Sequence, residues 1–259
     1  MKRINILIII FFGFIFIQCN EEFNYNNLDV KIYEVLQDSL VAYYPFNGNA
    51  NDESIYINNA IVHGATLTTN RFGDTNKAYY FHGKDNYLEV PHTSNIQPQS
   101  EISLCAWVYP MDFNKDRNQA NDIIYKGYTD DDQGAYILRY EDYDDDNSVF
   151  TPVEVFTFQL NFRNVGRVGI GSISKIDLNS WYFVVGTYDG TNMKLYVNSI
   201  LENTYKIVGD RQSNNKKLMI GRQDDNSYPY WVTGILDDIR IYNRALTDCE
   251  INTLYNMKE

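Results

Sequence analysis

Cysteine is scarce in this sequence, which has only three in 259 residues. A secreted scaffold held together by several disulfides is therefore excluded, because three cysteines form at most one bridge. Cys105 lies in the apolar stretch 102–110, which favours a buried thiol. The alternative is a bridge between Cys105 and Cys249, which an oxidising compartment would permit.

Long apolar runs are missing beyond the N-terminus. The one long run, residues 4–17, holds 14 residues, whereas a transmembrane helix needs about 20. It follows the basic residues Lys2 and Arg3 and precedes Cys19. Basic, apolar and processing segments in this order are typical of a secretory signal. We therefore expect residues 1–18 to be a signal peptide.

Cys19 and the residues before it resemble the lipobox of bacterial lipoproteins. The resemblance implies that Cys19 is lipidated and anchors the mature chain in the bacterial outer membrane. Two or three acyl chains give a stable anchor, whereas one chain binds only marginally. Gln18 departs from the usual small residue, so a plain signal peptide is the alternative. Glu21 and Glu22 resemble signals that direct some lipoproteins to the cell surface.

Positive charge is also in short supply. Without Lys2 and Arg3, the chain has 20 basic and 34 acidic residues, a side-chain charge of about −14. Nucleic acid and other polyanions are disfavoured as partners, because binding them relies on lysine and arginine neutralising phosphates. Such a composition suits a solvated surface and hard cations.

Short apolar stretches separated by Asn, Asp and Gly indicate strands. We expect residues 19–37 to be a tether and residues 38–259 to be one folded domain. The predicted strands are 40–46, 60–69, 78–83, 87–92, 102–110, 135–141, 155–163, 181–189, 194–199, 217–222 and 235–243. Asn198-Ser199 falls where a two-residue hairpin turn would prefer Asn-Gly. After Arg244 the chain predicts one helix, with Thr247 and Glu250 as a capping box.

These elements predict an all-β fold, a two-sheet antiparallel jelly-roll sandwich with a short C-terminal helix. The segments "LVAYYPFNGNANDES", "AYYFHGKDNYLEVP", "ISLCAWVYP", "WYFVVGTYDGTNMKLYVNS", "LMIGR" and "GILDDIRIYNRALTDCEINTLY" together resemble the LamG-like (laminin-G type 3) concanavalin A-like lectin/glucanase domain. The likeness runs from Leu40 to Tyr255. It implies one concave and one convex sheet, frequent carbohydrate or protein ligands, and frequent calcium. The fold also hosts glycosidases, so it does not decide function.

An acidic catalytic motif is absent. Glycosidases of this fold place Glu-x-Asp-x-(x)-Glu on one strand face, and hydrolysis needs two carboxylates about 5 to 9 Å apart. Asp237 and Asp238 are adjacent, so strand alternation predicts opposite faces for them. The histidines His63, His82 and His92 stand apart, with no Ser/His/Asp spacing. We therefore predict that the protein is not an enzyme; a glycoside hydrolase or lyase is the alternative.

Asp237 is instead a candidate metal ligand. It shares strand parity with Ile239 and Ile241, so we expect it to point between the sheets. A buried carboxylate needs a partner, and Ca²⁺, which takes six to eight oxygens, is a natural one. Asp238 is expected to be surface charge. The alternative for Asp237 is an ion pair or a turn cap, with Arg240 or Arg244 as the partner.

The family resemblance implies a structural calcium on an aspartate at this place in the last strand. The other ligands usually come from turns near the start of the domain. Here these turns offer Asp52, Asn47 and the carbonyl of Gly83. A second acidic cluster, 142–148, fails as an EF-hand and with 129–133 predicts solvated loops; a weak second calcium site is the alternative.

One loop-like stretch carries clustered aromatic residues, which are the side chains that stack on sugars. Tyr228, Tyr230 and Trp231 surround Pro229. We predict that they contact a glycan or a surface protein; the alternative is a loop clamped over the sandwich edge. The predicted function is a non-catalytic, calcium-stabilised binding module anchored at the cell surface. A purely structural or adhesion protein of the envelope is a further alternative.

Overall fold

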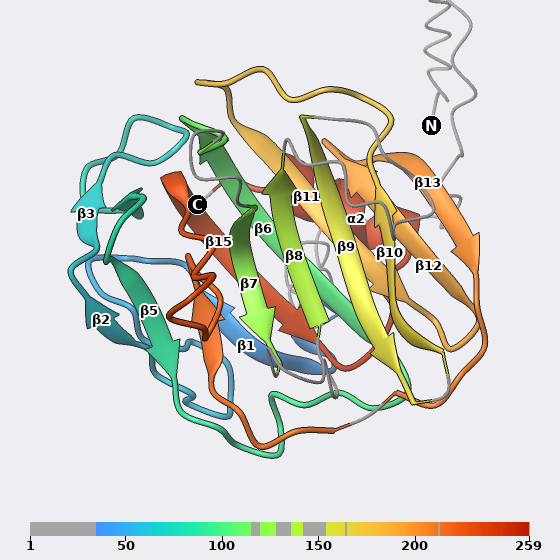
Figure 1. The fold of residues 1–259 in the computed structure, drawn as a ribbon. Helices are drawn as coiled ribbons and strands as arrows, with labels where there is room; N and C mark the ends of the chain where they lie inside the picture. The colour runs from blue at the N-terminus through green and yellow to red at the C-terminus, as the bar shows by residue number, and fades with distance from the viewer. Residues whose placement is uncertain are drawn as a thin grey trace, which may run out of the picture.

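The computed structural model describes residues 35–114, 120–127, 136–141, 154–163, 165–211 and 213–258. These residues form strands β1 to β15 and a C-terminal helix, α2. The strands make two sheets that lie one in front of the other (Figure 1). The predicted signal peptide 1–18, Cys19 and the acidic stretches 129–133 and 142–148 lie outside the described residues.

All strand pairs in both sheets are antiparallel. The first sheet has eight strands, with β1 (Leu40–Tyr44) paired to β15 and the other seven in the order β13 (Ile200–Lys206), β12 (Asn192–Val197), β11 (Tyr182–Tyr188), β6 (Ile102–Pro110), β15 (Thr233–Tyr242), β4 (Ala78–His82) and β3 (Thr66–Thr68). The second sheet has the order β10 (Gly166–Gly171), β9 (Val155–Phe162), β8 (Tyr136–Glu141), β7 (Asn121–Lys126), β14 (Leu218–Ile220), β5 (Tyr87–Val90) and β2 (Ile61–His63). The predicted all-β, two-sheet jelly-roll sandwich is confirmed.

The sequence of strand β6 is apolar at both odd and even positions, and the structure shows why. Its alternate residues Leu104 and Ala106 belong to the core between the sheets. Cys105 and Trp107, which point the other way, belong to a second cluster on the outer face. Both faces of the sheet are therefore buried at β6, and alternation of apolar and polar residues is lost in this strand.

Helix α2 (Asp248–Asn256) covers that outer face with Ile251 and Leu254. Thr247 and Glu250 form the predicted capping box: the Thr247 hydroxyl accepts from the Glu250 amide at 3.3 Å, and the Glu250 carboxylate accepts from the Thr247 amide at 2.8 Å. Leu36 is buried in the same outer cluster, so the end of the predicted tether packs against the domain. No helix within the described ranges is both long enough and apolar enough to cross a bilayer.

Cys105 is a free, fully buried thiol, as predicted. Burial raises its pKa to about 12, so it stays protonated and unreactive at neutral pH. The alternative, a bridge between Cys105 and Cys249, is therefore wrong.

Residues with positive φ angles form a hairpin turn and allow one segment to pass from one sheet to the other. Asn198 and Ser199 have φ angles of 51° and 64°, and they join Val197 to Ile200 as the predicted two-residue hairpin turn. The predicted single strand 60–69 is instead two short strands in different sheets. Gly64, with φ of 70°, lies between them and allows the chain to change sheet.

Three strands escaped prediction. β13 is an edge strand with mostly exposed, polar residues, and β10 has three glycines in six residues. Both therefore lack the apolar pattern on which strand prediction depends. β7 begins with Asn121 and Asp122, two polar residues that are fully buried in the structure.

Candidate functional site

The two aspartates of β15 both lie on the outer face of the first sheet. The pairing of β15 with β6 is irregular between Asp237 and Arg240, and Asp238 has φ of 53°. This is a β-bulge, which inserts one residue and resets the alternation of side chains. Leu236 and Ile239 consequently both face the core between the sheets. The expectations that the aspartates point to opposite faces, and that Asp237 points between the sheets, are wrong.

Arg71 binds both carboxylates. Its Nη1 lies 2.7 Å from Asp237 Oδ2, and its Nη2 lies 3.3 Å from Asp238 Oδ2. Arg240 Nη1 lies 2.7 Å from Asp238 Oδ1. All four side chains are at most 6% exposed, so Asp238 is not the predicted surface charge. Asp237 thus forms an ion pair, the alternative to metal binding, with Arg71, which sequence reasoning missed.

The other predicted metal ligands have protein partners of their own. Asp52 accepts four hydrogen bonds of 2.7–2.8 Å, from three backbone amides and one hydroxyl, and so holds the turn after β1. Asn47 Oδ1 accepts from Lys77 Nζ. Gly83 has φ of 78° and lies beside the Thr233 side chain. Within the described residues, no three His, Cys, Asp or Glu side chains are grouped so as to hold a metal ion.

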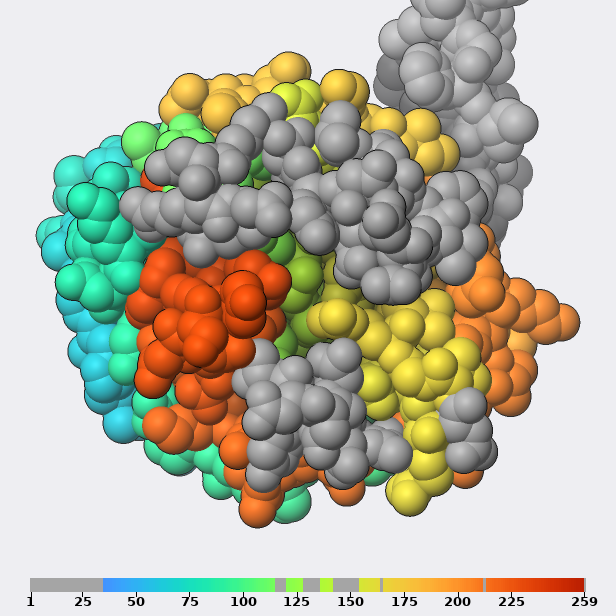
Figure 2. Space-filling model, viewed as in Figure 1, coloured from blue at the N-terminus to red at the C-terminus, as the bar shows by residue number. Residues whose placement is uncertain are grey.

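A different group of side chains gathers on the outer face of the second sheet. His63 and Tyr87 stack with ring centroids 4.3 Å apart, and Trp231 lies 5.9 Å from Tyr87. We call these three side chains the aromatic row. Tyr87 points outward because Leu88, its neighbour on β5, belongs to the core between the sheets. Figure 2 shows the orange-red segment 222–232, which carries Trp231, standing on this face.

Hydrogen bonds hold the segment 222–232 in place. The Asp122 amide donates to the Tyr230 carbonyl at 3.0 Å, which ties the segment to β7. The Arg222 guanidinium lies 4.3 Å from the Trp231 ring and 5.0 Å from the Tyr87 ring. It also donates from Nε to the Gln223 carbonyl at 2.6 Å. Arg222 thus orients the aromatic row through cation–π contacts while its own donors bind the loop.

The three residues predicted to contact a ligand do not all lie in the aromatic row. Trp231 is part of the aromatic row, and Tyr230 lies beside it, with its ring centroid 6.4 Å from that of Tyr228. Tyr228 is 63% exposed. Sequence reasoning missed His63 and Tyr87, which are far from Trp231 in the sequence. Their position on strands with outward-facing parity was the available signal.

A charged cluster lies next to Tyr230. Arg139 Nε on β8 contacts Asp122 Oδ1 on β7 at 2.7 Å, and its Nη1 lies 3.7 Å from Glu141 Oε2. The Arg139 guanidinium lies 5.4 Å from the Tyr230 ring. Burial raises the pKa of Asp122 to about 6, although Arg139 opposes this effect. The cluster was not predicted, because strand β7 was not.

Comparisons with known proteins place the fold. The family model described as "Concanavalin A-like lectin/glucanases superfamily" matches residues 81–252. The chain is similar to the binding domain of Paraclostridial Mosquitocidal Protein 1, with a TM-score of 0.65 and 18% identity over 85% of this chain and 52% of that one. No curated protein matches the chain.

Two further solved structures are similar. Domain 4 of AbnA, an extracellular arabinanase from Geobacillus stearothermophilus, was solved with arabinotriose; the TM-score is 0.63 at 15% identity, over 84% of this chain and 98% of that one. A structure of botulinum neurotoxin type C gives 0.63 at 18% identity, over 86% and 52%. The chain thus spans about half of the toxin chains. Because the family match covers about two thirds of the sequence, the chain belongs to the concanavalin A-like lectin/glucanases superfamily.

Proposed function

We propose that the protein is a non-catalytic binding module whose aromatic row recognises a glycan. The observation that carries the proposal is the row itself: three partly buried rings gathered on the outer face of the second sheet, with His63 stacked on Tyr87 at 4.3 Å and Trp231 tilted against Tyr87 at 5.9 Å. His63 and Tyr87 cover one face of each other, so a ligand meets the exposed parts of these two rings together with the ring of Trp231. Aromatic side chains offer a large apolar contact area and lose little conformational entropy when a ligand binds. Such a surface suits the apolar faces of sugar rings.

The row is held before any ligand binds. Arg222 packs on two of its rings, and the backbone of Tyr230 is tied to β7. A ligand therefore does not have to order the segment 222–232, which lowers the cost of association. The solved relatives are consistent with this proposal, since domain 4 of AbnA was solved with arabinotriose, and botulinum neurotoxin type C depends on two ganglioside molecules to enter cells.

A surface protein is the second candidate ligand. Tyr228, on the same segment, is 63% exposed, and aromatic residues of this kind are enriched in protein interfaces. Tyr228 and the aromatic row can be tested separately, because Tyr228 is not one of the three rings of the row.

The charged cluster gives no support to catalysis. Asp122 and Glu141 lie on one face of the second sheet, but both contact Arg139. A glycosidase needs one carboxyl group that can donate a proton and a second that can reach the sugar or a water. An arginine between the two carboxylates engages both. Release of reducing sugar from polysaccharides by the purified protein would overturn this part of the proposal.

Lipid anchoring stays a proposal based on the N-terminal sequence. We propose that Cys19 is acylated and holds the domain at the bacterial cell surface. Incorporation of a labelled fatty acid in cells, lost in Cys19→Ser, would support it. Protease accessibility on intact cells would then establish the cell-surface location.

Calcium at Asp237 also stays an untested prediction, but the side chains do not fit it as they lie. The guanidinium of Arg71 supplies positive charge at Asp237 and Asp238, and the oxygens of Asp52 accept backbone and hydroxyl hydrogen bonds. A melting temperature that falls on adding EDTA would show that a metal nevertheless stabilises the domain.

The direct test of glycan binding is a glycan array followed by calorimetry on the ligand found. We expect Trp231→Ala to weaken binding at least tenfold, in line with the loss of one stacking aromatic anchor. Tyr56→Ala is the matched control, because Tyr56 is a partly exposed aromatic residue outside the row. Unchanged affinity in Trp231→Ala, with an unchanged melting temperature, would refute the role of the row. Loss of binding only in Tyr228→Ala would indicate that Tyr228, and not the aromatic row, contacts the ligand.

A further inference from the structure

Two hollows adjoin at the edge of the sandwich, where the chain segments after β5 and before β14 come together. We call the first the amide pocket; its volume is about 610 Å³, and it is lined by uncharged polar side chains such as Gln97, Asn214 and Asn215. We call the second the arginine pocket; its volume is about 510 Å³, and Arg163 and Arg211 line it. Gln99 lines both, so the two hollows are neighbours.

Arg211 is an unusual buried cation. It is 5% exposed, and none of its three guanidinium nitrogens has a hydrogen-bond partner among the residues that the structure describes. Its backbone is fixed by a bridge to Phe162 at the end of β9. Burial lowers its pKa to about 10, against the opposing effect of the Tyr136 and Tyr188 hydroxyls, so it is still charged at neutral pH. An unpaired buried charge is costly, and a nearby anion would offset that cost.

A second positive charge lies on the same pocket. Arg163 is exposed, and its amide donates to the Asp210 carbonyl at 2.8 Å. Asp210 also lines the pocket, and its side chain is the one carboxylate among the lining residues that the structure describes. That carboxylate is exposed to solvent, where water screens it, whereas the charge of Arg211 is buried. The net charge of the residues that line the arginine pocket is therefore positive.

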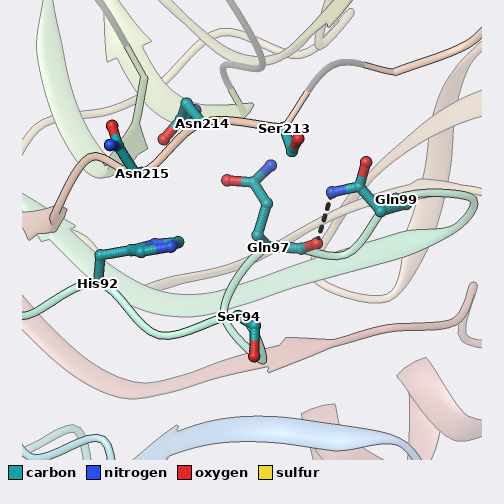
Figure 3. A pocket seen from close by; sticks show the side chains of 7 residues that line it. All are labelled: His92, Ser94, Gln97, Gln99, Ser213, Asn214 and Asn215. Atoms are coloured by element: carbon teal, nitrogen blue, oxygen red, sulfur yellow. Dashed lines mark hydrogen bonds between the residues drawn. The ribbon is translucent and has the colours of Figure 1, made fainter.

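The amide pocket offers neutral hydrogen-bonding groups. In Figure 3 the side chain of Gln97 extends into the hollow between His92 and the segment that carries Ser213 and Asn214. Gln99 Nε2 donates to the Gln97 carbonyl at 2.9 Å. The Asn214 side chain is oriented by the buried Lys126, whose Nζ lies 3.0 Å from Asn214 Oδ1. Oriented amides and hydroxyls are the groups that bind sugar hydroxyls.

We propose that these pockets form a second glycan site, which takes an acidic sugar in the arginine pocket and a neutral sugar in the amide pocket. The acidic group is a single carboxylate or sulfate ester, because guanidinium groups bind both. The net charge of −12 over the whole chain would repel a polyanion, so the ligand is a glycan end with one acidic residue. None of the lining residues belongs to the aromatic row, so this site does not depend on the function proposed for the row.

Calorimetry on the full chain tests the proposal with four probes. They are a glucuronic-acid-terminated disaccharide, its neutral glucose-terminated counterpart, the sulfated counterpart, and sodium sulfate. We expect one of the two acidic disaccharides to bind at least tenfold more tightly than the neutral one, and the preference to shrink as salt is raised. The comparison of the two acidic probes distinguishes carboxylate from sulfate ester.

Arginine variants then locate the binding. We expect Arg211→Gln and Arg163→Gln each to abolish most of the preference for the acidic probe, while Lys84→Gln, which removes an exposed charge elsewhere, leaves it unchanged. Arg163 is exposed, so its variant should fold even if Arg211→Gln does not, which melting curves establish.

Three results would overturn the proposal. They are equal affinity for acidic and neutral probes, acidic binding that survives Arg163→Gln, and sodium sulfate binding as tightly as the disaccharides. The last would indicate an anion site without glycan recognition. Trp231→Ala separates the two glycan sites, because it should leave binding to the arginine pocket intact even if the aromatic row proves to have no ligand.

Discussion

The Arg71 network gives the sharpest prediction about what holds this fold together. Removing the guanidinium in Arg71→Gln takes away the 2.7 Å contact of Asp237 and the 3.3 Å contact of Asp238. The Asp237 side chain is fully buried, so water does not replace the contact. Removing one partner from a buried ion pair costs about 3–5 kcal/mol. For a domain of this size, 3 kcal/mol lowers the melting temperature by about 6–12 °C.

The geometry also predicts the order of a series of variants. Arg71→Lys keeps the charge but has no planar fork to reach two carboxylates, and it loses the stacking of the guanidinium on Trp107 at 4.5 Å. We therefore expect it to be intermediate between wild type and Arg71→Gln. In Arg71→Gln/Asp237→Asn neither charge of the pair remains, so the double variant should lose less stability than the sum of the single variants by at least about 1 kcal/mol.

Urea denaturation at neutral pH measures these free energies of unfolding, with Lys84→Gln as the control for loss of an exposed positive charge. A loss below about 1 kcal/mol in Arg71→Gln would refute the reasoning, because it would place the pair in the range of exposed salt bridges. Strict additivity in the double variant would also refute it, since the two side chains would then not interact.

The remaining predictions concern pH, a helix cap and a turn. Burial raises the pKa of Asp122 to about 6, above its value of about 3.9 in unfolded chains, so its contribution to stability is complete below pH 4 and is lost as pH rises through 6. The stability of wild type relative to Asp122→Asn, measured by urea denaturation, should therefore fall by up to about 3 kcal/mol between pH 4 and 7; a flat difference would contradict this. Thr247→Ala should cost about 1 kcal/mol by removing the cap of α2, with Thr253→Ala inside the helix as a comparison. Ser199→Gly should raise the melting temperature slightly, because φ of 64° strains serine and not glycine; a lower melting temperature would show that the lost serine side chain matters more.

The predictions from sequence succeeded where neighbours along the chain decide the outcome. The Asn198-Ser199 turn and the Thr247 cap depend on residues at most three positions apart, and both are confirmed. The buried strand β6 was also recognisable, because apolar side chains occur on both parities of its nine residues, which suits a sheet that is covered on both faces.

The bulge in β15 shows where pattern reading failed. Alternation assigned Asp237 and Asp238 to opposite faces, and it is reliable only in a regular strand. Asp238 instead adopts φ of 53°, and both carboxylates point to Arg71. Arg71 is 166 residues before Asp237, so no local signal linked them.

The candidate binding surfaces also depend partly on neighbours along the chain and partly on contacts between distant residues. The sequence alone determined the sandwich class, the helix cap, the hairpin turn and the aromatic character of the segment around Trp231, because composition and short-range spacing set these features. Only the tertiary structure decided that Tyr87 lies between His63 and Trp231. It also decided that the buried Arg211 guanidinium lines a pocket and has no hydrogen-bond partner among the described residues. The physical reason is that strand order and bulges determine which distant side chains share a face, and their interactions exist only once both sheets have formed.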